Sequence, residues 1–231
     1  MRSLSLALAL FVALAAGLAV ITDADATTPP AATPVMEDML ADRVIGKADA
    51  PVTILEFASL TCHHCATFHL KTLPELEKQA IETGKAKIIF RDFPLDGMAL
   101  KASALARCLP EDQYFPFIKV LFAQQEKWAH DPEPTKALAR YAALAGLSPD
   151  KAEACMNDTK ILDALAQGRL QAAEKYKIQA TPTLVLNDGA DTVQGGAKVE
   201  DIMAKINKLL PATMSKPVAA PADTKAEKPA N

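Results

Sequence analysis

The segment SLTCHHCATF places Cys62 and Cys65 two residues apart, with His63 and His64 between them. Two thiols at this spacing can close a disulfide across one helical turn, whereas the same four side chains, with His69, could also bind zinc. A small structural disulfide is a third interpretation. A structural zinc site needs a second ligand pair, and the sequence has no other Cys-x-x-Cys and no His-x-x-x-His. The pattern therefore favours a redox pair, with the other two interpretations as alternatives.

The position of Cys62 predicts an acidic thiol. Residues 52–57 form an apolar, β-branched run typical of a buried strand, and helical spacing begins at Cys62. Unpaired N–H groups and the positive end of a helix dipole stabilise a thiolate there, and His63 and His64 can add N–H donation or charge. A pKa lowered from about 8.5 to about 5 stabilises the reduced form by roughly 2.7 kcal/mol at pH 7. Cys65 should be less exposed and less acidic, so we expect an oxidising pair.

Glu56 is the one charge inside the otherwise apolar strand at residues 52–57. A buried carboxylate is costly unless it has a partner or a role. We therefore expect Glu56 to take and return the proton of Cys65 through a water molecule. The alternative is a Glu56 at the strand edge that reaches solvent or pairs with Arg91.

The other two cysteines, Cys108 and Cys155, lie in a stretch rich in Ala and Leu with helical spacing. Neither belongs to a Cys-x-x-Cys pair, and neither lies at a predicted helix start. A structural disulfide between them is the favoured interpretation, and two buried thiols or a second redox relay are the alternatives.

The N-terminus predicts export. Arg2 precedes an apolar run at residues 4–21, and Ala24 and Ala26 match a small-x-small cleavage rule. Residues 1–26 are therefore expected to be a signal peptide, although 4–21 is also long enough to remain as a membrane anchor. Either outcome places the rest of the chain outside the cytoplasm, in the periplasm, where thiols persist mainly as disulfides or redox pairs.

Strand and helix patterns divide the chain into six segments. The order is strand, helix, strand, then roughly four or five helices between residues 98 and 176, then strand character near TPTLVLN and Val193, and a last helix over 198–210. The expected segments are a signal peptide (1–26), a spacer (27–49), a first α/β part (50–97), a helical insertion (98–175), a second α/β part (176–210) and a disordered tail (211–231).

The ordered set EFASLTCHHC, FRDFPLD, a helical insertion with two cysteines, TPTLVLN and a Gly-Gly before the last helix resembles the DsbA-like branch of the thioredoxin superfamily. The resemblance implies an α/β thioredoxin fold with an inserted all-helical domain. It also implies that Cys62 is the nucleophile and Cys65 its internal partner. The family's best-known member has Pro-His between its cysteines, so the pair His63-His64 is a departure that bears on the redox potential.

Thr181 and Pro182 stand just before a predicted strand, where proline is poorly tolerated in a sheet centre. The resemblance implies a cis bond before Pro182, and an ordinary trans bond is the alternative. A cis bond would turn the Thr181 backbone N–H and C=O toward the disulfide and offer an edge for an extended substrate.

These patterns predict an exported thiol:disulfide oxidoreductase that donates its disulfide to reduced proteins without a metal or soluble cofactor. Without residues 1–26 the chain has 24 basic and 26 acidic side chains, so we expect no nucleic-acid partner. The resemblance implies reoxidation by a quinone-linked membrane partner. A disulfide isomerase or reductase is the alternative within enzymes. Isomerases of this kind usually carry a separate dimerisation module, for which the spacer leaves no room, and this argues against the isomerase. We also expect a monomer.

Overall fold

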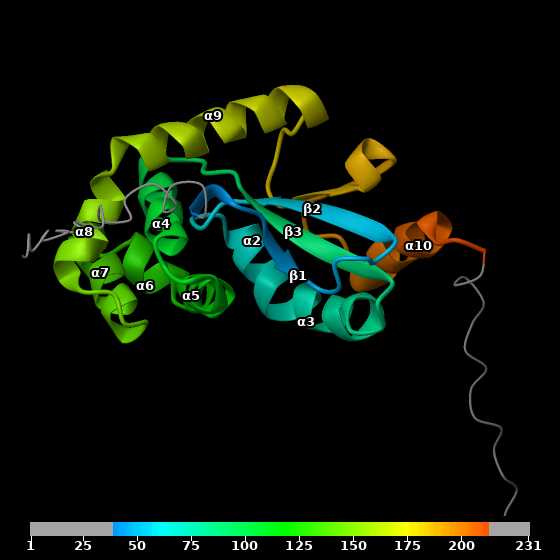
Figure 1. Ribbon diagram of the computed structural model, residues 1–231, viewed down its shortest axis with the longest axis horizontal. Helices are drawn as coiled ribbons and strands as arrows, with labels where there is room; N and C mark the ends of the chain where they lie inside the picture. The colour runs from blue at the N-terminus through cyan, green and yellow to red at the C-terminus, as the bar shows by residue number, and fades with distance from the viewer. Residues whose placement is uncertain (1–38, 213–231) are drawn as a thin grey trace, which may run out of the picture. The chain divides into compact units, whose positions relative to one another are not determined.

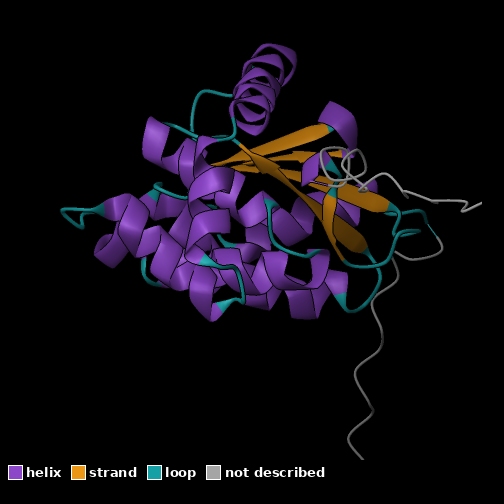
Figure 2. Ribbon diagram, turned by 60° about the vertical axis from the view of Figure 1, so that its left-hand side comes forward, coloured by secondary structure: helices purple, strands orange, loops and turns teal. Residues whose placement is uncertain are grey.

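The computed structural model describes residues 39–212, which form a mixed sheet with helices on both faces (Figures 1 and 2). The predicted signal peptide at 1–26, its possible anchor at 4–21 and all but the first two residues of the predicted tail at 211–231 lie outside this range. Among residues 39–212, no helix combines the length and apolar character needed to cross a bilayer.

The sheet has five strands in the order β1-β3-β2-β4-β5. The strands are β1 (Arg43–Ile45), β2 (Val52–Ala58), β3 (Ala86–Asp92), β4 (Thr183–Leu186) and β5 (Asp191–Gln194). β2 and β3 are parallel, and the other neighbours are antiparallel. The strands predicted near residues 52, 85, 183 and 193 are thus confirmed.

The predicted spacer over residues 27–49 is wrong at its C-terminal end, because β1 lies within it. Val44 of β1 pairs with Ile89 at the edge of the sheet. Three residues are too few to produce a period-2 pattern, so the sequence carries no signal for this strand. β1 forms because β3 offers it hydrogen-bonding groups along its outer edge.

Two apolar clusters cover the two faces of the sheet. Alternate residues of a strand point to opposite faces, so Ile54 faces one way and Leu55 and Phe57 the other. Ile54 packs with the helix that follows β2 and with α10 (Val199–Leu209). Phe57 packs with Ala172 of α9 (Thr159–Tyr176), which runs along the opposite face (Figure 1).

The helix after β2 contains two π-helical segments. It runs through α2 (His63–Thr67), η1 (Phe68–Thr72), α3 (Leu73–Leu76) and η2 (Glu77–Ile81) without leaving the helical region of φ and ψ at the junctions. Pro74 lies at the start of α3 and has no N–H to donate to the preceding turn. Gly84, with φ of +73°, lies just after the helical stretch, where a left-handed residue commonly ends a helix.

The insertion contains six helices between residues 97 and 176, rather than four or five. They are α4 (Gly97–Arg107), α5 (Glu111–Ala123), α6 (Gln125–Ala129), α7 (Pro134–Leu144), α8 (Pro149–Asn157) and α9. Short helices such as α6 escape sequence analysis because five residues show no clear period. The predicted α/β fold with a helical insertion is confirmed.

A disulfide joins Cys108, at the end of α4, to Cys155 in α8. This is the structural disulfide predicted from the sequence. The bond links α4 to α8 through two cysteines that are 47 residues apart in the chain.

Removing this bond should destabilise the protein. Cys108→Ala with Cys155→Ala should lower the free energy of unfolding by up to about 4 kcal/mol, because the unfolded chain regains the entropy of a loop of that length. Urea unfolding, followed by the fluorescence of the single, buried Trp128, measures the change. An unchanged urea midpoint would contradict the stabilising role.

Candidate active site

Cys62 and Cys65 lie where β2 passes into α2, with Cys62 as the N-cap residue. Both are free thiols in this structure; Cys62 is half-buried and Cys65 is fully buried. The Cys65 side chain and the backbone N–H groups of Cys65 and His64 hydrogen-bond to the Cys62 sulfur. One sulfur therefore faces the surface and the other faces the core.

The pKa of the Cys62 thiol is lowered to about 5. The largest cause is the hydrogen bond from the Cys65 side chain, and the Thr181 side chain and the two backbone N–H groups add to it against the opposing effect of burial. These are donors to a thiolate at a helix start, as the sequence predicted. At neutral pH Cys62 is therefore ionised.

The pKa of the Cys65 thiol is raised. Burial is the main cause, and the hydrogen bond and negative charge of Cys62 add to it. The N–H of Ser59, just past the end of β2, faces the Cys65 sulfur and opposes this effect only in part. Cys65 is therefore a neutral thiol whenever Cys62 is a thiolate.

The Thr181–Pro182 peptide bond is cis and brings Thr181 against Cys62. The Cys62 sulfur lies 3.3 Å from the Thr181 carbonyl oxygen, to which the thiol can donate. A thiolate cannot make this bond, but the Thr181 hydroxyl is buried without another partner and can donate to the charged sulfur. Thr181 thus offers a group to each protonation state of Cys62.

His63 and His64 are exposed, and their rings lie edge to face with centroids 6.0 Å apart. Within residues 39–212 no hydrogen bond joins either imidazole to the Cys62 sulfur. The contribution of His64 to the low pKa of Cys62 comes from its backbone N–H. Stabilisation of the thiolate by the two rings stays a prediction.

Glu56 is fully buried, as predicted, but the suggested alternative partner was wrong. Arg91 pairs with Asp42, whereas Glu56 Oε1 lies 2.7 Å from His69 Nε2. The ring of His69 stacks on Phe122, with centroids 4.4 Å apart. His69, which was considered as a metal ligand, is therefore held in the core by Phe122, and its Nε2 atom is bonded to Glu56.

Sequence analysis missed Gln125, which reaches the active-site loop from the helical insertion. Its amide donates to the carbonyl oxygens of Leu60 (2.8 Å) and Cys62 (3.1 Å). The sequence carries no clear signal for this contact, because α5 ends at Ala123 and Gln125 begins the five-residue helix α6, which is too short to show a period. Gln125 thus holds the backbone on both sides of Thr61, including that of Cys62.

Thr61 was also missed. Its hydroxyl donates to Asp96 (2.6 Å), the N-cap residue of α4, and lies 3.2 Å from the Ser59 hydroxyl. These bonds join the residue before Cys62 to the loop after β3. No periodic pattern marks such loop contacts, so the sequence alone could not have found them.

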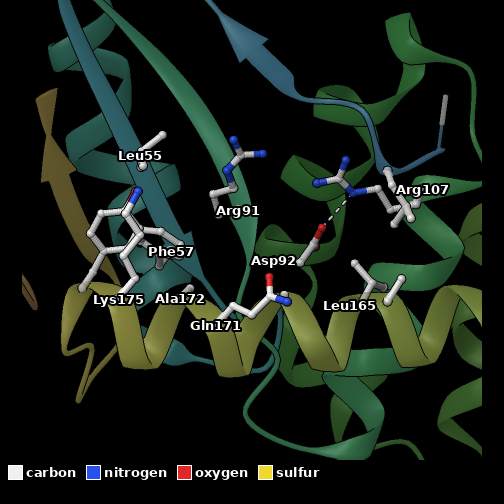
Figure 3. A pocket seen from close by; sticks show the side chains of 13 residues that line it. Leu55, Phe57, Arg91, Asp92, Arg107, Leu165, Gln171, Ala172 and Lys175 are labelled. Carbon is white, nitrogen blue, oxygen red and sulfur yellow. Dashed lines mark hydrogen bonds and ion pairs between the residues drawn. The ribbon is translucent and has the colours of Figure 1, made fainter. Parts of the chain in front are cut away.

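In the described part of the chain, no group of three or more His, Cys, Asp or Glu side chains is arranged to hold a metal ion. A hollow of about 380 Å³ lies between α9 and the sheet (Figure 3). It is lined by side chains such as Phe57, Arg91 and Gln171, and includes neither Cys62 nor Thr181. The cysteine site is separate from this hollow.

The comparisons with known proteins agree with this geometry. A sequence profile of the thioredoxin family matches residues 38–208. A Rickettsia felis protein described as a protein-disulfide oxidoreductase is 31% identical over 170 residues, which make up 73% of this chain and 60% of the relative. Disulfide bond formation protein D of Bacillus subtilis is 27% identical over 175 residues, covering 72% of this chain and 76% of that protein.

Solved structures show the same likeness. The crystal structure of Wolbachia pipientis α-DsbA1 has a TM-score of 0.67 and 34% identity, covering 74% of this chain and 91% of that one. The chain therefore belongs to the thioredoxin family, in its DsbA-like branch. The resemblance inferred from the sequence is confirmed. The chain spans about three-fifths of the length of the Rickettsia relative.

The low pKa of Cys62 predicts how pH affects the stability of the reduced protein. Because the folded pKa is below the unfolded value, the thiolate's contribution is complete above the unfolded pKa of about 8.5 and is lost as pH falls toward 5. The oxidised protein has no such group, and the raised pKa of Cys65 keeps that thiol neutral throughout this range. Lowering the pH from 8 to 5 should therefore reduce the Tm of the reduced protein relative to the oxidised protein. A difference in Tm that does not change with pH would contradict the assigned pKa.

Thr181→Val should raise the pKa of Cys62 above 5, because valine keeps the shape of threonine and removes the hydroxyl donor. Thiolate absorbance at 240 nm against pH measures this pKa. Thr183→Val is the matched control, since the Thr183 hydroxyl donates to the Ala180 carbonyl oxygen (2.7 Å) instead of Cys62. An equal pKa in wild type and Thr181→Val would remove Thr181 from the list of thiolate donors.

Proposed function

We propose that this protein is an exported thiol:disulfide oxidoreductase that donates a Cys62–Cys65 disulfide to reduced substrate proteins. The observation that carries the proposal is the difference between the two sulfurs: a half-buried Cys62 with a pKa of about 5 and a buried Cys65 whose pKa is raised. Stabilising the Cys62 thiolate stabilises the reduced protein, which makes the disulfide a better oxidant.

The reaction begins at the more accessible sulfur. A substrate thiolate attacks Cys62, the disulfide bond breaks, and Cys65 leaves with the electron pair and takes up a proton. A second substrate thiolate then attacks the substrate sulfur of the mixed disulfide, and Cys62 leaves as a stable thiolate. The substrate is oxidised by two electrons and the protein is reduced by two.

The substrate is proposed to bind as an extended segment beside Thr181 and Pro182. The Thr181 carbonyl oxygen lies next to the Cys62 sulfur, so a β-like hydrogen bond there would bring a substrate cysteine to the nucleophile. Glu56 remains our proposed proton acceptor and donor for Cys65. His63 and His64, both exposed beside Cys62, are proposed to contact the incoming substrate and to tune the thiolate when protonated.

Export, periplasmic location and the reoxidising partner are further parts of the proposal. The apolar run at 4–21 and the cleavage pattern before residue 27 support export. The resemblance to DsbA-like proteins supports reoxidation by a quinone-linked membrane partner and action as a monomer without a cofactor.

The direction of electron transfer is tested by equilibrating the Cys62–Cys65 pair with glutathione and counting free thiols by mass after trapping. We expect a potential well above the roughly −220 to −260 mV extracted for cytosolic glutathione, because the thiolate is stabilised. A potential below that range would favour a reductase or isomerase instead. The Cys108→Ala, Cys155→Ala double variant is the control that limits the thiol count to the active pair.

The mixed disulfide can be trapped directly. Disulfide-loaded Cys65→Ala, in which Cys62 is joined to a small thiol, should form a lasting disulfide with a reduced substrate protein that carries a single cysteine, because neither Cys65 nor a second substrate thiol can release it. Cys62→Ala should form none. If Cys62→Ala traps substrate as well as Cys65→Ala does, the nucleophile is wrongly assigned.

A further inference from the structure

The buried bond between Glu56 and His69 joins two ionisable side chains. Glu56 Oε1 and His69 Nε2 are 2.7 Å apart, and the exposed fractions of the two side chains are 0% and 4%. The other Glu56 oxygen, Oε2, is buried without a hydrogen-bond partner. A buried, unpartnered carboxylate oxygen costs free energy, so its presence indicates a group that binds something transiently, such as a proton or a water.

The same two elements that hold Cys65 also hold this pair. The Cys65 sulfur lies against the Ser59 N–H at the end of β2, and Glu56 is three residues earlier in that strand. His69 is one turn after Cys65 in the helix that follows. Phe90 and Phe122, whose rings contact His69, belong to the same apolar cluster as Cys65. The Glu56–His69 bond therefore joins β2 to the following helix. The contact between the Cys65 sulfur and the Ser59 N–H joins the same two segments nearby.

Cys65 needs a proton when it leaves the disulfide. Its environment is apolar, and burial raises its pKa, so a Cys65 thiolate would be an uncompensated buried charge. In the mixed disulfide the substrate is attached to Cys62 and covers the nearest surface. The proton must then reach Cys65 by another route.

A small hollow beside His69 offers that route. It has a volume of about 50 Å³ and is lined by His69, Leu73, Pro74, Phe115 and Ile45, with Glu77 and Lys119 toward solvent. Such a volume can hold a few water molecules, each of which needs about 10–15 Å³. Its lining includes neither Cys62 nor Thr181, so a substrate at the cysteine site leaves it open.

We infer that His69 is a positioning residue that passes protons between the water-accessible hollow and Glu56, and so supplies and removes the Cys65 proton while a substrate covers Cys62. This rests on the proposed thiol–disulfide exchange at Cys62 and Cys65. His69 accepts a proton from water in the hollow at one ring nitrogen and delivers one to Glu56 Oε1 from the other. Glu56 passes a proton from Oε2 to the Cys65 thiolate, directly or through one water.

The proton balance is closed in both directions. On reduction, the S–S bond breaks, Cys65 receives the electron pair, and one proton moves from the hollow to its sulfur. On reoxidation, Cys65 returns this proton along the same path as its sulfur bonds to Cys62. No redox group beyond the thiols is needed.

Two ionisable groups behind the pair, Tyr114 and Arg107, are respectively neutral and ion-paired. Burial raises the pKa of Tyr114, which packs across Phe90 from His69, so it stays neutral. Behind Tyr114, Arg107 pairs with Asp92 at 2.7 Å, as the dashed line in Figure 3 shows, and Arg43 lies over the Tyr114 ring. On the solvent side, Glu77 and Lys119 line the mouth of the hollow. His69 is thus the member of the pair with access to water.

The test follows the reduction of the Cys62–Cys65 disulfide by reduced glutathione in a single turnover, in the full-length protein. The measured quantity is the ratio of the variant rate to the wild-type rate at each pH between 6 and 8. His69→Gln keeps a hydrogen bond to Glu56 but cannot carry the proton, and His69→Phe keeps only the aromatic packing. Both should be about tenfold slower or more at pH 8, with a smaller deficit at pH 6, where solvent supplies protons more readily. The pKa of Cys62, followed at 240 nm, should not change.

His130→Gln is the matched control. His130 is exposed and pairs with Glu126 on the surface, so its loss should leave the rate ratio at one. If His69 has only a structural role, its substitution should lower the Tm and change the rate by the same factor at every pH. Folded His69 variants that react at wild-type rates at every pH would overturn the relay.

If the His69 variants do not fold, the inference can still be tested in the wild-type protein. The ¹⁵N chemical shifts of the His69 ring should differ between the oxidised and reduced states at a fixed pH, because the relay then holds a different set of protons. Identical shifts in both states would overturn the inference. A protein that fails to oxidise substrates yet shows the His69 effect would refute the proposed function alone, and an oxidase without the effect would refute the relay alone.

Discussion

The burial of Cys65 behind Cys62 is the constraint on which the rest of this structure depends. Two chemically identical groups, one helical turn apart, differ because one meets hydrogen-bond donors at a helix start and the other meets apolar side chains. Either environment alone would be ordinary. In the reaction that we propose, these two environments together decide which sulfur is attacked, which one leaves, and where charge remains afterwards.

Each layer of the fold contributes to that difference. β2 ends where its next N–H meets the Cys65 sulfur, and the chain then turns so that α2 begins at Cys62. The segment before β4 adds Thr181, which serves Cys62 in both protonation states. The core beneath Cys65 comes largely from the insertion, including Trp128 and Phe122. The site is thus made by segments that are far apart in the chain and that no single motif describes.

The sequence could predict whatever depends on local pattern. The strand before Cys62, the disulfide between Cys108 and Cys155 and the burial of Glu56 all follow from periodicity, composition or the cost of a buried charge. The partner of Glu56 could not be predicted, because His69 and Arg91 are equally plausible partners until the sheet order and helix phase are known. β1 and α6 are too short for a period to emerge, and the loop contacts of Thr61 depend on tertiary structure alone.

Gln125 binds the helical insertion to the backbone on either side of Thr61, and the apolar cluster around Cys65 is shared between the two parts. Cys62 therefore lies where the sheet part and the helical insertion meet, and not within one of them alone. Shortening the chain to its sheet and flanking helices would remove Gln125, the hydrogen-bond donor to the carbonyl oxygens of Leu60 and Cys62. It would also expose the buried side of Cys65 to solvent. The insertion therefore forms part of the environment of both cysteines. A shortened protein would need new residues to replace its apolar contacts with Cys65 and its hydrogen bonds to the active-site loop.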